Sequence, residues 1–243
     1  MLYFMKNPSV FEFAFHQPMP NRIISTLKPR KMPRQARSAA TVDAVFEATI
    51  QVLLAGGASR LTTTRVAERA GVSVGTMYQY FPNKQALLYA VLSRHLDEVL
   101  AKVEGACRAA MGLPAAQMVA ALVATYIEAK TSNTQVSIAL YSVITELDVP
   151  ELIGKIGTRM TRAIEAMLAS ASDLLFEDVA LVTSMLRAAM TGVTRTVFEQ
   201  NAGPALIGKS HVELLTMCQA YVQAVGVKRR IGSVRSRAGA RAA

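Results

Sequence analysis

Three polar side chains that lie close together in the sequence have the chemistry needed to read a nucleic acid. Thr76, Gln79 and Tyr80 fall on a short segment of predicted helix, and none of them has an obvious place in a protein core. Hydroxyl and amide groups on a helix that enters the major groove of DNA hydrogen-bond to phosphates and base edges. The segment therefore predicts nucleic-acid binding, provided that its neighbours hold the helix outward.

The flanking residues predict a helix-turn-helix that would hold the polar segment in place. Gly71 supplies the left-handed backbone that ends a first helix, and Ser73 is placed to cap a second one. The second helix is too short to be stable unless it is packed, and Ala67 is small where the two helices must approach closely. Four apolar side chains, counted from Thr63, are spaced to point into the gap between the helices: Val66, Ala70, Val72 and Met77.

Residues 61–88, LTTTRVAERAGVSVGTMYQYFPNKQALL, resemble the DNA-binding domain of the TetR family of bacterial transcriptional regulators. With the preceding amphipathic helix the resemblance covers about residues 38–92, and its most specific part is TMYQYFPNK, residues 76–84. The remainder matches only in length and helical character. The resemblance implies a homodimeric repressor that binds a palindromic operator in double-stranded DNA and leaves it when a small-molecule effector binds.

The resemblance also implies which residues contact DNA. Hydroxyl and ammonium groups suit phosphates, which fits Thr64, Tyr78 and Lys84. A second interpretation of Tyr78 is that its ring packs in the core of the small domain. The full set of implied contacts is Thr64, Arg65, Val74, Gly75, Thr76, Tyr78, Gln79, Tyr80 and Lys84.

Base reading is expected from a smaller group on the second helix. Gln79 suits the major-groove edge of adenine, where an amide can make two hydrogen bonds. Val74 or the methyl group of Thr76 suits a thymine methyl group. Arg65 can pair with a guanine or with a phosphate, and the sequence leaves both readings open.

Helical periodicity continues along the chain, and no segment alternates with the period of a strand. The fold class is therefore all-α with about nine helices, three small ones and then a larger bundle. The resemblance implies that the first three form a helix-turn-helix DNA-binding domain and that the bundle is a helical ligand-binding and dimerisation domain. Besides the helix-turn-helix, we expect helices at residues 38–56, 84–110, 115–131, 134–147, 150–172, 177–201 and 211–227. The expected divisions are a disordered basic arm (1–37), the DNA-binding domain (38–92), the effector-binding and dimerisation domain (93–227) and a disordered basic tail (228–243).

The net charge of +10 is concentrated at the two ends of the chain. Such arms either contact phosphates and the minor groove in a salt-dependent way or remain solvated tails. Both readings stay open for each arm. The basic residues are Lys28, Arg30, Lys31, Arg34 and Arg37 at one end, and Lys228, Arg229, Arg230, Arg235, Arg237 and Arg241 at the other.

Residues 1–31 differ in character from the rest, because they combine aromatic side chains with four prolines. They lack the basic start, the apolar run and the cleavage site of a signal peptide. The segment from Met32 resembles a typical start for the family. We therefore expect residues 1–31 to be disordered or to reflect the choice of start site.

Within the resemblance, the larger domain binds the effector and forms the dimer. Apolar lining with a few polar groups suits a lipophilic effector, and the candidate pocket residues are Tyr126, Tyr141, Thr145 and Glu146. The last two helices carry apolar stripes. Periodicity does not show whether such a stripe packs in the core or forms a dimer interface, so both interpretations stay open. The candidate dimer residues are Val182, Leu186, Met190, Val193, Leu215 and Val222.

Two other functions compete with a repressor. An activator or an effector-independent DNA binder would have the same sequence features. A helical nucleotide-binding enzyme is the remote alternative, because residues 203–210, GPALIGKS, fit the pattern of a phosphate-binding loop. That loop needs a buried strand before it, and here a predicted helix precedes it. We therefore interpret residues 201–210 as a link between the last two helices, with Ser210 as a cap.

No residues suggest a catalytic centre, a cofactor or a metal ion. His16, His95 and His211 are scattered and lack the spacing of metal ligands. Cys107 and Cys218 lie far apart, so buried reduced thiols in a cytoplasmic protein are expected, with a redox sensor as an unsupported alternative.

One stretch has nearly the length of a membrane span. Residues 109–127 carry no charge, but Gly112 and Pro114 break the run. The part that follows Pro114 reads better as a buried bundle helix, and no membrane partner is expected.

Overall fold

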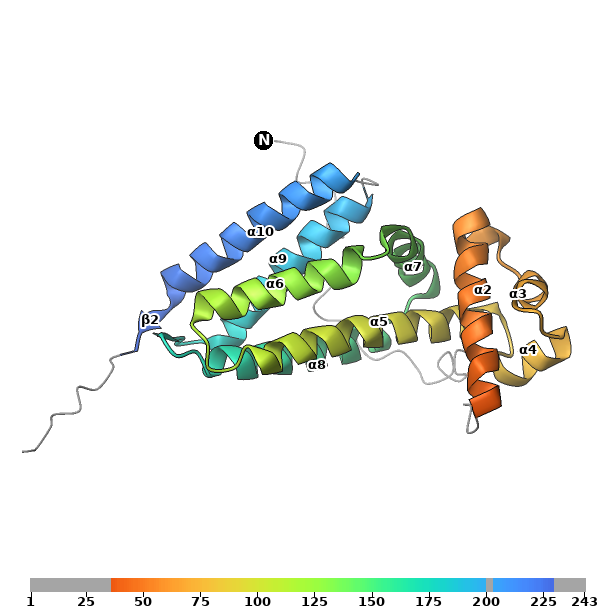
Figure 1. Cartoon of the computed structure of the whole chain (residues 1–243), viewed down its shortest axis with the longest axis horizontal. Helices are drawn as coiled ribbons and strands as arrows, with labels where there is room; N and C mark the ends of the chain where they lie inside the picture. Colours follow the sequence, from red (N-terminus) through yellow and green to blue (C-terminus); the bar gives the residue numbers. More distant parts are fainter. Residues whose placement is uncertain (1–35, 200–202, 230–243) are drawn as a thin grey trace, which may run out of the picture.

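The computed structural model describes residues 36–199 and 203–229. These residues form nine α-helices and one short antiparallel pair of strands. Three helices form a small domain at one end of an elongated molecule, and α5 runs from it into a larger bundle (Figure 1). The predicted all-α architecture is confirmed.

The small domain contains α2 (Ala36–Arg60), α3 (Thr63–Ala70) and α4 (Val74–Tyr80). The helical backbone of α2 is interrupted at Gly57, where φ is 70°, next to the predicted end of this helix. Met77 of α4 is fully buried. Val66 and Ala67 of α3 are also fully buried in the same core, as their spacing predicted.

Local hydrogen bonds account for the short lengths of α3 and α4. Gly71 has a φ of 66°, and its N–H donates to the Glu68 carbonyl at 3.2 Å, so the left-handed end of α3 is confirmed. The Ser73 hydroxyl oxygen accepts from the Thr76 N–H at 3.0 Å and caps α4. The expected turn chemistry is therefore present at both ends of the turn.

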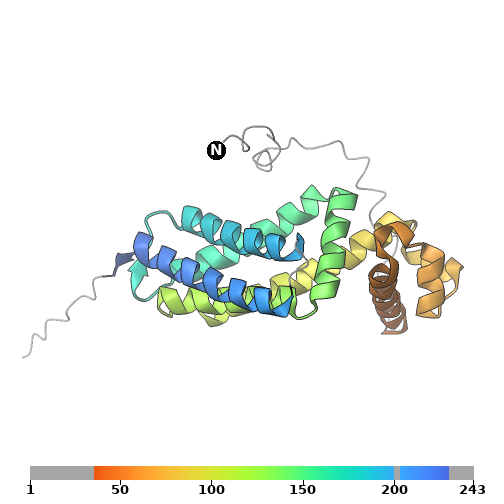
Figure 2. The same ribbon diagram turned by 90° about the horizontal axis from the view of Figure 1, so that it is seen from above.

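The larger domain is a bundle in which α5 packs against α6 and α8, and α10 packs against α6 and α9. Arg159 of α8 donates to both carboxylate oxygens of Glu104 on α5, at 3.1 and 2.9 Å, which fastens these two helices. Figure 2 shows α9 and α10 side by side along the bundle. The helices are α5 (Lys84–Ala109), α6 (Ala115–Thr131), α7 (Thr134–Leu147), α8 (Pro150–Ala169), α9 (Val179–Glu199) and α10 (Pro204–Val225).

A single apolar core extends through both domains. It includes Leu88 and Leu92 near the start of α5 and Leu100 and Val103 farther along the same helix, all almost fully buried. Because α5 contributes to the packing of both domains, a shift of this helix must disturb both.

A short ladder closes the end of the bundle opposite the small domain. The strand β1 (Leu174–Leu175) pairs antiparallel with β2 (Val227–Lys228), and the Arg229 N–H donates to the Asp173 carbonyl at 2.8 Å. The sequence did not reveal this ladder, because two residues are too short to show alternation.

The start of α10 differs from the prediction. The helix begins at Pro204 with Gly203 at its N-cap, so the predicted link at residues 201–210, with Ser210 as a cap, is wrong. Proline favours the first turn of a helix, where its missing N–H is not needed. Residues 204–210 are thus helical and do not form a phosphate-binding loop.

Within the described part of the chain, one helix is long and apolar enough to cross a membrane, namely residues 38–60 of α2. Its side chains Val45, Ala48 and Leu53 are buried in the small domain. The stretch at residues 109–127 is divided between α5 and α6, as its glycine and proline predicted. Most of the two basic arms, and residues 1–31, fall outside the described residues.

The left-handed conformation of Gly71 gives a stability prediction. Replacing Gly71 with alanine places a Cβ at a φ of 66° and should lower the free energy of unfolding by about 1–2 kcal/mol. A Cβ added to Gly154 of α8 would meet no heavy atom within 4 Å, and φ there is not positive. Gly154→Ala should therefore raise the free energy of unfolding by about 0.5–1 kcal/mol. Urea unfolding followed by circular dichroism compares the two. Equal effects of the two substitutions would contradict the assigned turn.

Candidate nucleic-acid interface

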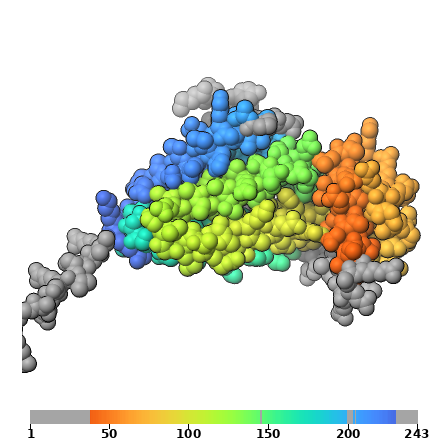
Figure 3. All heavy atoms as spheres, in the orientation of Figure 1, coloured from red at the N-terminus to blue at the C-terminus, as the bar shows by residue number. Residues whose placement is uncertain are grey.

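One face of α4 is open to solvent at the end of the molecule. Val74 and Tyr78 are 38% and 42% exposed, and Gly75 and Gln79 are also exposed. Met77 on the opposite face is fully buried. Figure 3 shows the small domain at the end of the molecule far from β2, with its outer surface uncovered by the bundle. The helix is therefore held outward by its packed face.

Tyr78 lies on this exposed face and not in the core. Its hydroxyl is 3.1 Å from the hydroxyl oxygen of Thr63, a buried residue of α3. The hydrogen bond fixes the aromatic ring beside the start of α3. Of the two readings of Tyr78, packing in the domain core is therefore excluded.

The other two polar residues of α4 are less exposed than Gln79. The Thr76 hydroxyl lies 2.8 Å from the Ser73 hydroxyl at the start of the helix. Tyr80 packs against the core, with its ring centroid 6.2 Å from that of Phe81. The expectation that Tyr80 has no place in the core is thus wrong, because the last turn of α4 lies beside the buried Phe81.

The start of α3 adds two exposed residues to the same end of the molecule, Thr64 and Arg65. The Arg65 guanidinium donates to the Arg60 carbonyl at 3.1 Å. This bond orients the side chain but uses one of several donors, so the remaining N–H groups stay available.

Lys84, the remaining predicted contact, is anchored within the protein. Its ammonium donates to the Ala58 carbonyl at 2.6 Å and lies 3.3 Å from the Glu146 carboxylate, and the side chain is 26% exposed. Lys84 therefore joins the end of α2 to the bundle helix α7. Sequence reasoning missed this role, because α2 and α7 are far apart along the chain.

The predicted pocket residues that the structure describes have different surroundings. Glu146 is exposed and paired with Lys84, so its assignment to a ligand pocket is wrong. Tyr141 packs its ring 6.4 Å from that of Phe198, and the side chain of Thr145 falls outside the description. Only Tyr126 lies deep in the bundle. Burial raises the pKa of its hydroxyl, and the neighbouring Thr191 and Thr194 side chains offset this only in part.

Three buried polar atoms near α9 and α10 lack partners among the described residues. They are the hydroxyl oxygen of Thr183, Nε of Arg187 and Nε2 of His211. Arg187 also donates to the Thr161 hydroxyl of α8. Unsatisfied buried groups are uncommon and call for water or a ligand. No sequence pattern singled out Arg187, because its burial depends on how α8 and α9 pack.

The predicted dimer stripe is mostly core. Val182, Leu186, Met190 and Val222 are buried inside the chain, so their assignment to a dimer interface is wrong. Val193 and Leu215 are partly buried against the same core. The exposed apolar side chains of α9 and α10 are different ones: Leu181, Met185, Leu206, Val212, Met217 and Val225.

Both cysteines are buried, and burial raises the pKa of the Cys107 and Cys218 thiols to about 11. The reactive thiolate is therefore scarce at neutral pH. No three side chains of His, Cys, Asp or Glu gather as metal ligands in residues 36–199 and 203–229.

An outward helix joined to a packed partner by a left-handed glycine, and followed by a helical bundle, defines a helix-turn-helix protein of the transcriptional-regulator class. Residues 45–91 match the family described as bacterial regulatory proteins, tetR family. Residues 114–221 match the tetracyclin repressor-like C-terminal domain. The chain belongs to the TetR family.

Similar proteins agree with this assignment. The transcriptional repressor KstR of Mycolicibacterium smegmatis is 40% identical over 65 residues, which are 27% of this chain and 32% of KstR. The chain thus spans about a third of the length of this relative. SmeT, the repressor of the Stenotrophomonas maltophilia efflux pump SmeDEF, has a TM-score of 0.60 at 19% identity, over 76% of this chain and 90% of that one. FadR of Bacillus subtilis, in complex with stearoyl-CoA, has a TM-score of 0.57 at 17% identity, over 73% of this chain and 97% of that one. These two structures share the fold.

The anchored ammonium of Lys84 gives a second stability prediction. Lys84→Met keeps the apolar stem but removes both interactions, and should lower the free energy of unfolding by about 1–2 kcal/mol. Glu146→Gln removes only the partly exposed ion pair and should cost less than about 1 kcal/mol. Thermal unfolding of both variants tests the difference. Wild-type stability in Lys84→Met would show that these contacts contribute nothing.

Proposed function

We propose that this protein is a cytoplasmic homodimeric transcriptional repressor that leaves its operator when a small molecule binds within the bundle. The observation that carries the proposal is the exposed face of α4, with Val74, Tyr78 and Gln79 turned away from the packed Met77. A helix held in this way can enter the major groove without unfolding any part of the protein.

The exposed residues have distinct roles in this proposal. Gln79 reads adenine, and Val74 with the Thr76 methyl group reads thymine, while Gly75 and Tyr80 shape the helix surface. Thr64, Arg65 and Tyr78 contact phosphates, and Arg65 has guanine as its other partner. Lys84 has its ammonium close to Glu146 in the free protein, so its contact with phosphate requires the ion pair to open.

A dimer supplies the second DNA-binding domain that a palindromic operator needs. Two half-sites on one face of the duplex lie about 34–36 Å apart. The apolar side chains left exposed on α9 and α10 fit a four-helix interface with a second copy, because they would otherwise face water. Leu181 and Met185 of α9, with Leu206 and Met217 of α10, form this proposed interface.

The effector site proposed for the bundle interior is built around Tyr126. Tyr126 belongs to the buried apolar cluster, and the unsatisfied Arg187 and Thr183 groups on α9 would gain partners from a ligand with one polar end. A lipophilic effector with a polar head fits this mixture. The stearoyl-CoA in the FadR structure is a ligand of that kind in a protein of the same fold.

Release from DNA follows from the shared helix α5 and the contacts of α7. A ligand that swells the bundle shifts α5, whose first turns belong to the DNA-binding domain core. To move a two-state equilibrium almost completely, the effector needs a preference of about 5.5 kcal/mol for the released state. The two DNA-binding domains of the dimer then no longer match the half-site spacing.

Substitution of Gln79 separates base reading from general affinity. Gln79→Ala should weaken binding to the operator by about 1–3 kcal/mol and leave binding to random DNA unchanged, because it removes only a base contact. Tyr78→Phe should weaken binding to the operator and to random DNA by a similar amount, since it removes the hydroxyl that contacts phosphate and that also bonds to Thr63. Footprinting of the protein's own upstream region identifies the operator, and fluorescence anisotropy measures the affinities. Equal losses on both DNAs for Gln79→Ala would contradict the assignment.

Charge on the proposed dimer face should separate the subunits. Met185→Glu combined with Met217→Glu places like charges in the interface and should give monomers in analytical ultracentrifugation, with loss of operator binding. Met111→Glu is the control, because Met111 is equally exposed but lies at the corner between α5 and α6. A dimeric double variant would place the interface elsewhere.

A further inference from the structure

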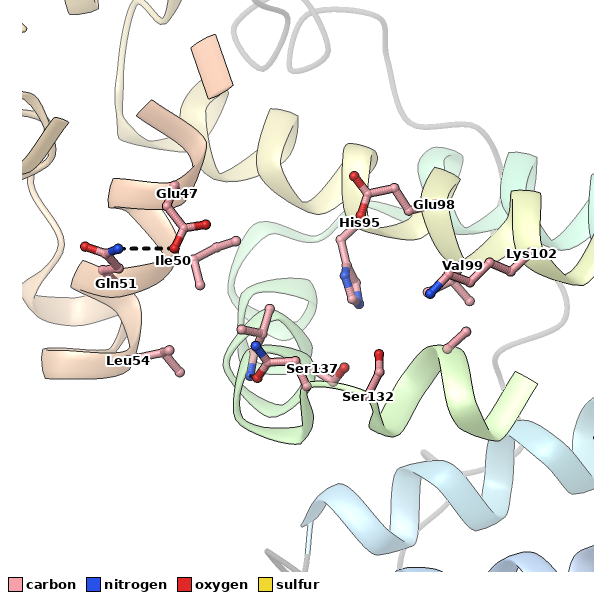
Figure 4. Close-up of a pocket in the computed structure, with 13 residues that line it drawn as sticks. Glu47, Ile50, Gln51, Leu54, His95, Glu98, Val99, Lys102, Ser132 and Ser137 are labelled. Atoms are coloured by element: carbon pink, nitrogen blue, oxygen red, sulfur yellow. Dashed lines mark hydrogen bonds between the residues drawn. The ribbon is translucent and has the colours of Figure 1, made fainter. Parts of the chain in front are cut away.

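A cleft of about 300 Å³ separates the DNA-binding domain from the bundle. One wall belongs to α2, and the other is built by α5 and by the corner between α6 and α7 (Figure 4). Its volume lies at the lower end of the range for small-molecule sites. None of the residues assigned to DNA contacts, to the effector or to the dimer lines it.

The bundle wall of the cleft offers several hydrogen-bond donors. His95 and Lys102 reach from α5 toward Ser132 and Ser137 at the α6–α7 corner (Figure 4). Within residues 36–199 and 203–229, neither the Lys102 ammonium nor the hydroxyls of Ser132 and Ser137 have a hydrogen-bond or ion-pair partner. Ser137 is nevertheless a buried residue, with an exposed fraction of 5%. These groups face the cleft with their bonding capacity unused.

Two carboxylates, Glu47 and Glu98, also line the cleft, and among the described residues neither forms an ion pair with Lys102. Glu98 accepts a hydrogen bond from Nε of Arg94 at 3.0 Å, and Glu47 accepts one from the Gln51 amide at 3.1 Å. Lys130 lies close enough to influence His95, and no described carboxylate pairs with it. Burial lowers the pKa of Lys130 to about 8, so it remains largely charged at neutral pH. The bundle side therefore presents the unpaired ammonium of Lys102, with the Lys130 charge close to His95, and an anion beside Lys102 would stabilise this charge.

His95 contributes a neutral ring to this wall. Burial, with the Lys130 charge, lowers the pKa of His95 to about 4, so the imidazole is uncharged at pH 7. A neutral imidazole still has one donor and one acceptor. The ring can hydrogen-bond to a ligand without adding to the repulsion among the lysines.

The α2 wall is mixed, with Ile50 and Leu54 beside Glu47 and Gln51. Ile50 and Leu54 of α2 face the cleft, and Leu54 is 44% exposed although it is a large hydrophobic side chain. Val136 of α7 adds an apolar side chain on the bundle side. An occupant of this cleft therefore meets hydrogen-bond donors and the Lys102 charge on the bundle side, and Ile50 and Leu54, beside Glu47, on the α2 side.

We propose that the cleft is a second ligand site that binds a small anionic amphiphile, a carboxylate or a phosphate monoester with a short hydrocarbon part. The anionic group lies at Lys102, Ser132 and Ser137, and the hydrocarbon part lies against Ile50 and Leu54. Because one wall belongs to the DNA-binding domain, the ligand ties α2 to the bundle. Its affinity is then coupled reciprocally to that for DNA, a consequence that rests on the proposed function, whereas the binding itself does not.

Isothermal titration calorimetry of the full chain tests the site without DNA. The probes are hexanoate, monohexyl phosphate and hexanol, so that the first two compare the anionic groups and the third removes the charge. Both anions, or one of them, should bind, and hexanol should bind at least about tenfold more weakly. Heat from neither anion up to about 10 mM, or equal affinity for hexanol, would overturn the proposal.

Variants place the bound anion in the cleft. Lys102→Met and Leu54→Glu change opposite walls at exposed positions, and each should weaken anion binding by about tenfold or more. Lys155→Met is the matched control on the exposed surface of α8 and should bind like the wild type. Wild-type affinity in both cleft variants would overturn the proposal.

Tyr126→Phe distinguishes this site from the effector site in the bundle interior. The substitution should leave anion binding unchanged, because Tyr126 does not line the cleft. If it abolished anion binding, the anion would occupy the bundle interior, and the second site would be refuted while the proposed repressor function stood. Loss of DNA binding in another variant would not affect this assay.

Discussion

The burial of Met77 is the interaction on which the DNA-binding end of this protein depends. The helix α4 has seven residues, too few to be stable alone in water. Met77 is fully buried in the same core as Val66 and Ala67, and this packing fixes the orientation of α4. With Met77 inside, Gln79 and the Tyr78 ring have to point outward. Gly71 makes the crossing of the two helices possible, since its left-handed backbone is costly for other residues.

The helix α5 gives the molecule its second constraint. Its first residues pack in the small domain and its later residues pack in the bundle, so the two domains share one core. The α2 helix is also held to α5 by the Arg94–Asp43 ion pair and to α7 through Lys84 and Glu146. These exposed polar contacts can break at low cost, whereas the core cannot be strained without loss of packing. A conformational change is therefore expected to use the polar contacts first.

Much of the candidate site could be predicted because it depends on local patterns. The turn at Gly71, the cap at Ser73 and the burial of Met77 each follow from residues within one or two turns of a helix. Predictions that depended on packing between segments far apart in the sequence were wrong more often. Glu146 was assigned to a pocket but pairs with Lys84, and the stripe that includes Leu186 and Met190 is core. Apolar periodicity shows that a helix has a buried face, but not what covers it.

The sequence by itself determined the helical fold class, the helix-turn-helix and the outward direction of Gln79, because spacing and turn chemistry act over a few residues. Only the tertiary structure decided which apolar side chains of α9 and α10 stay exposed, where the Lys84 ammonium rests, and that a cleft with unpaired donors opens between α2 and the α6–α7 corner. The physical reason is that these features arise where helices distant in sequence meet, and their geometry is set by side-chain packing across the whole molecule.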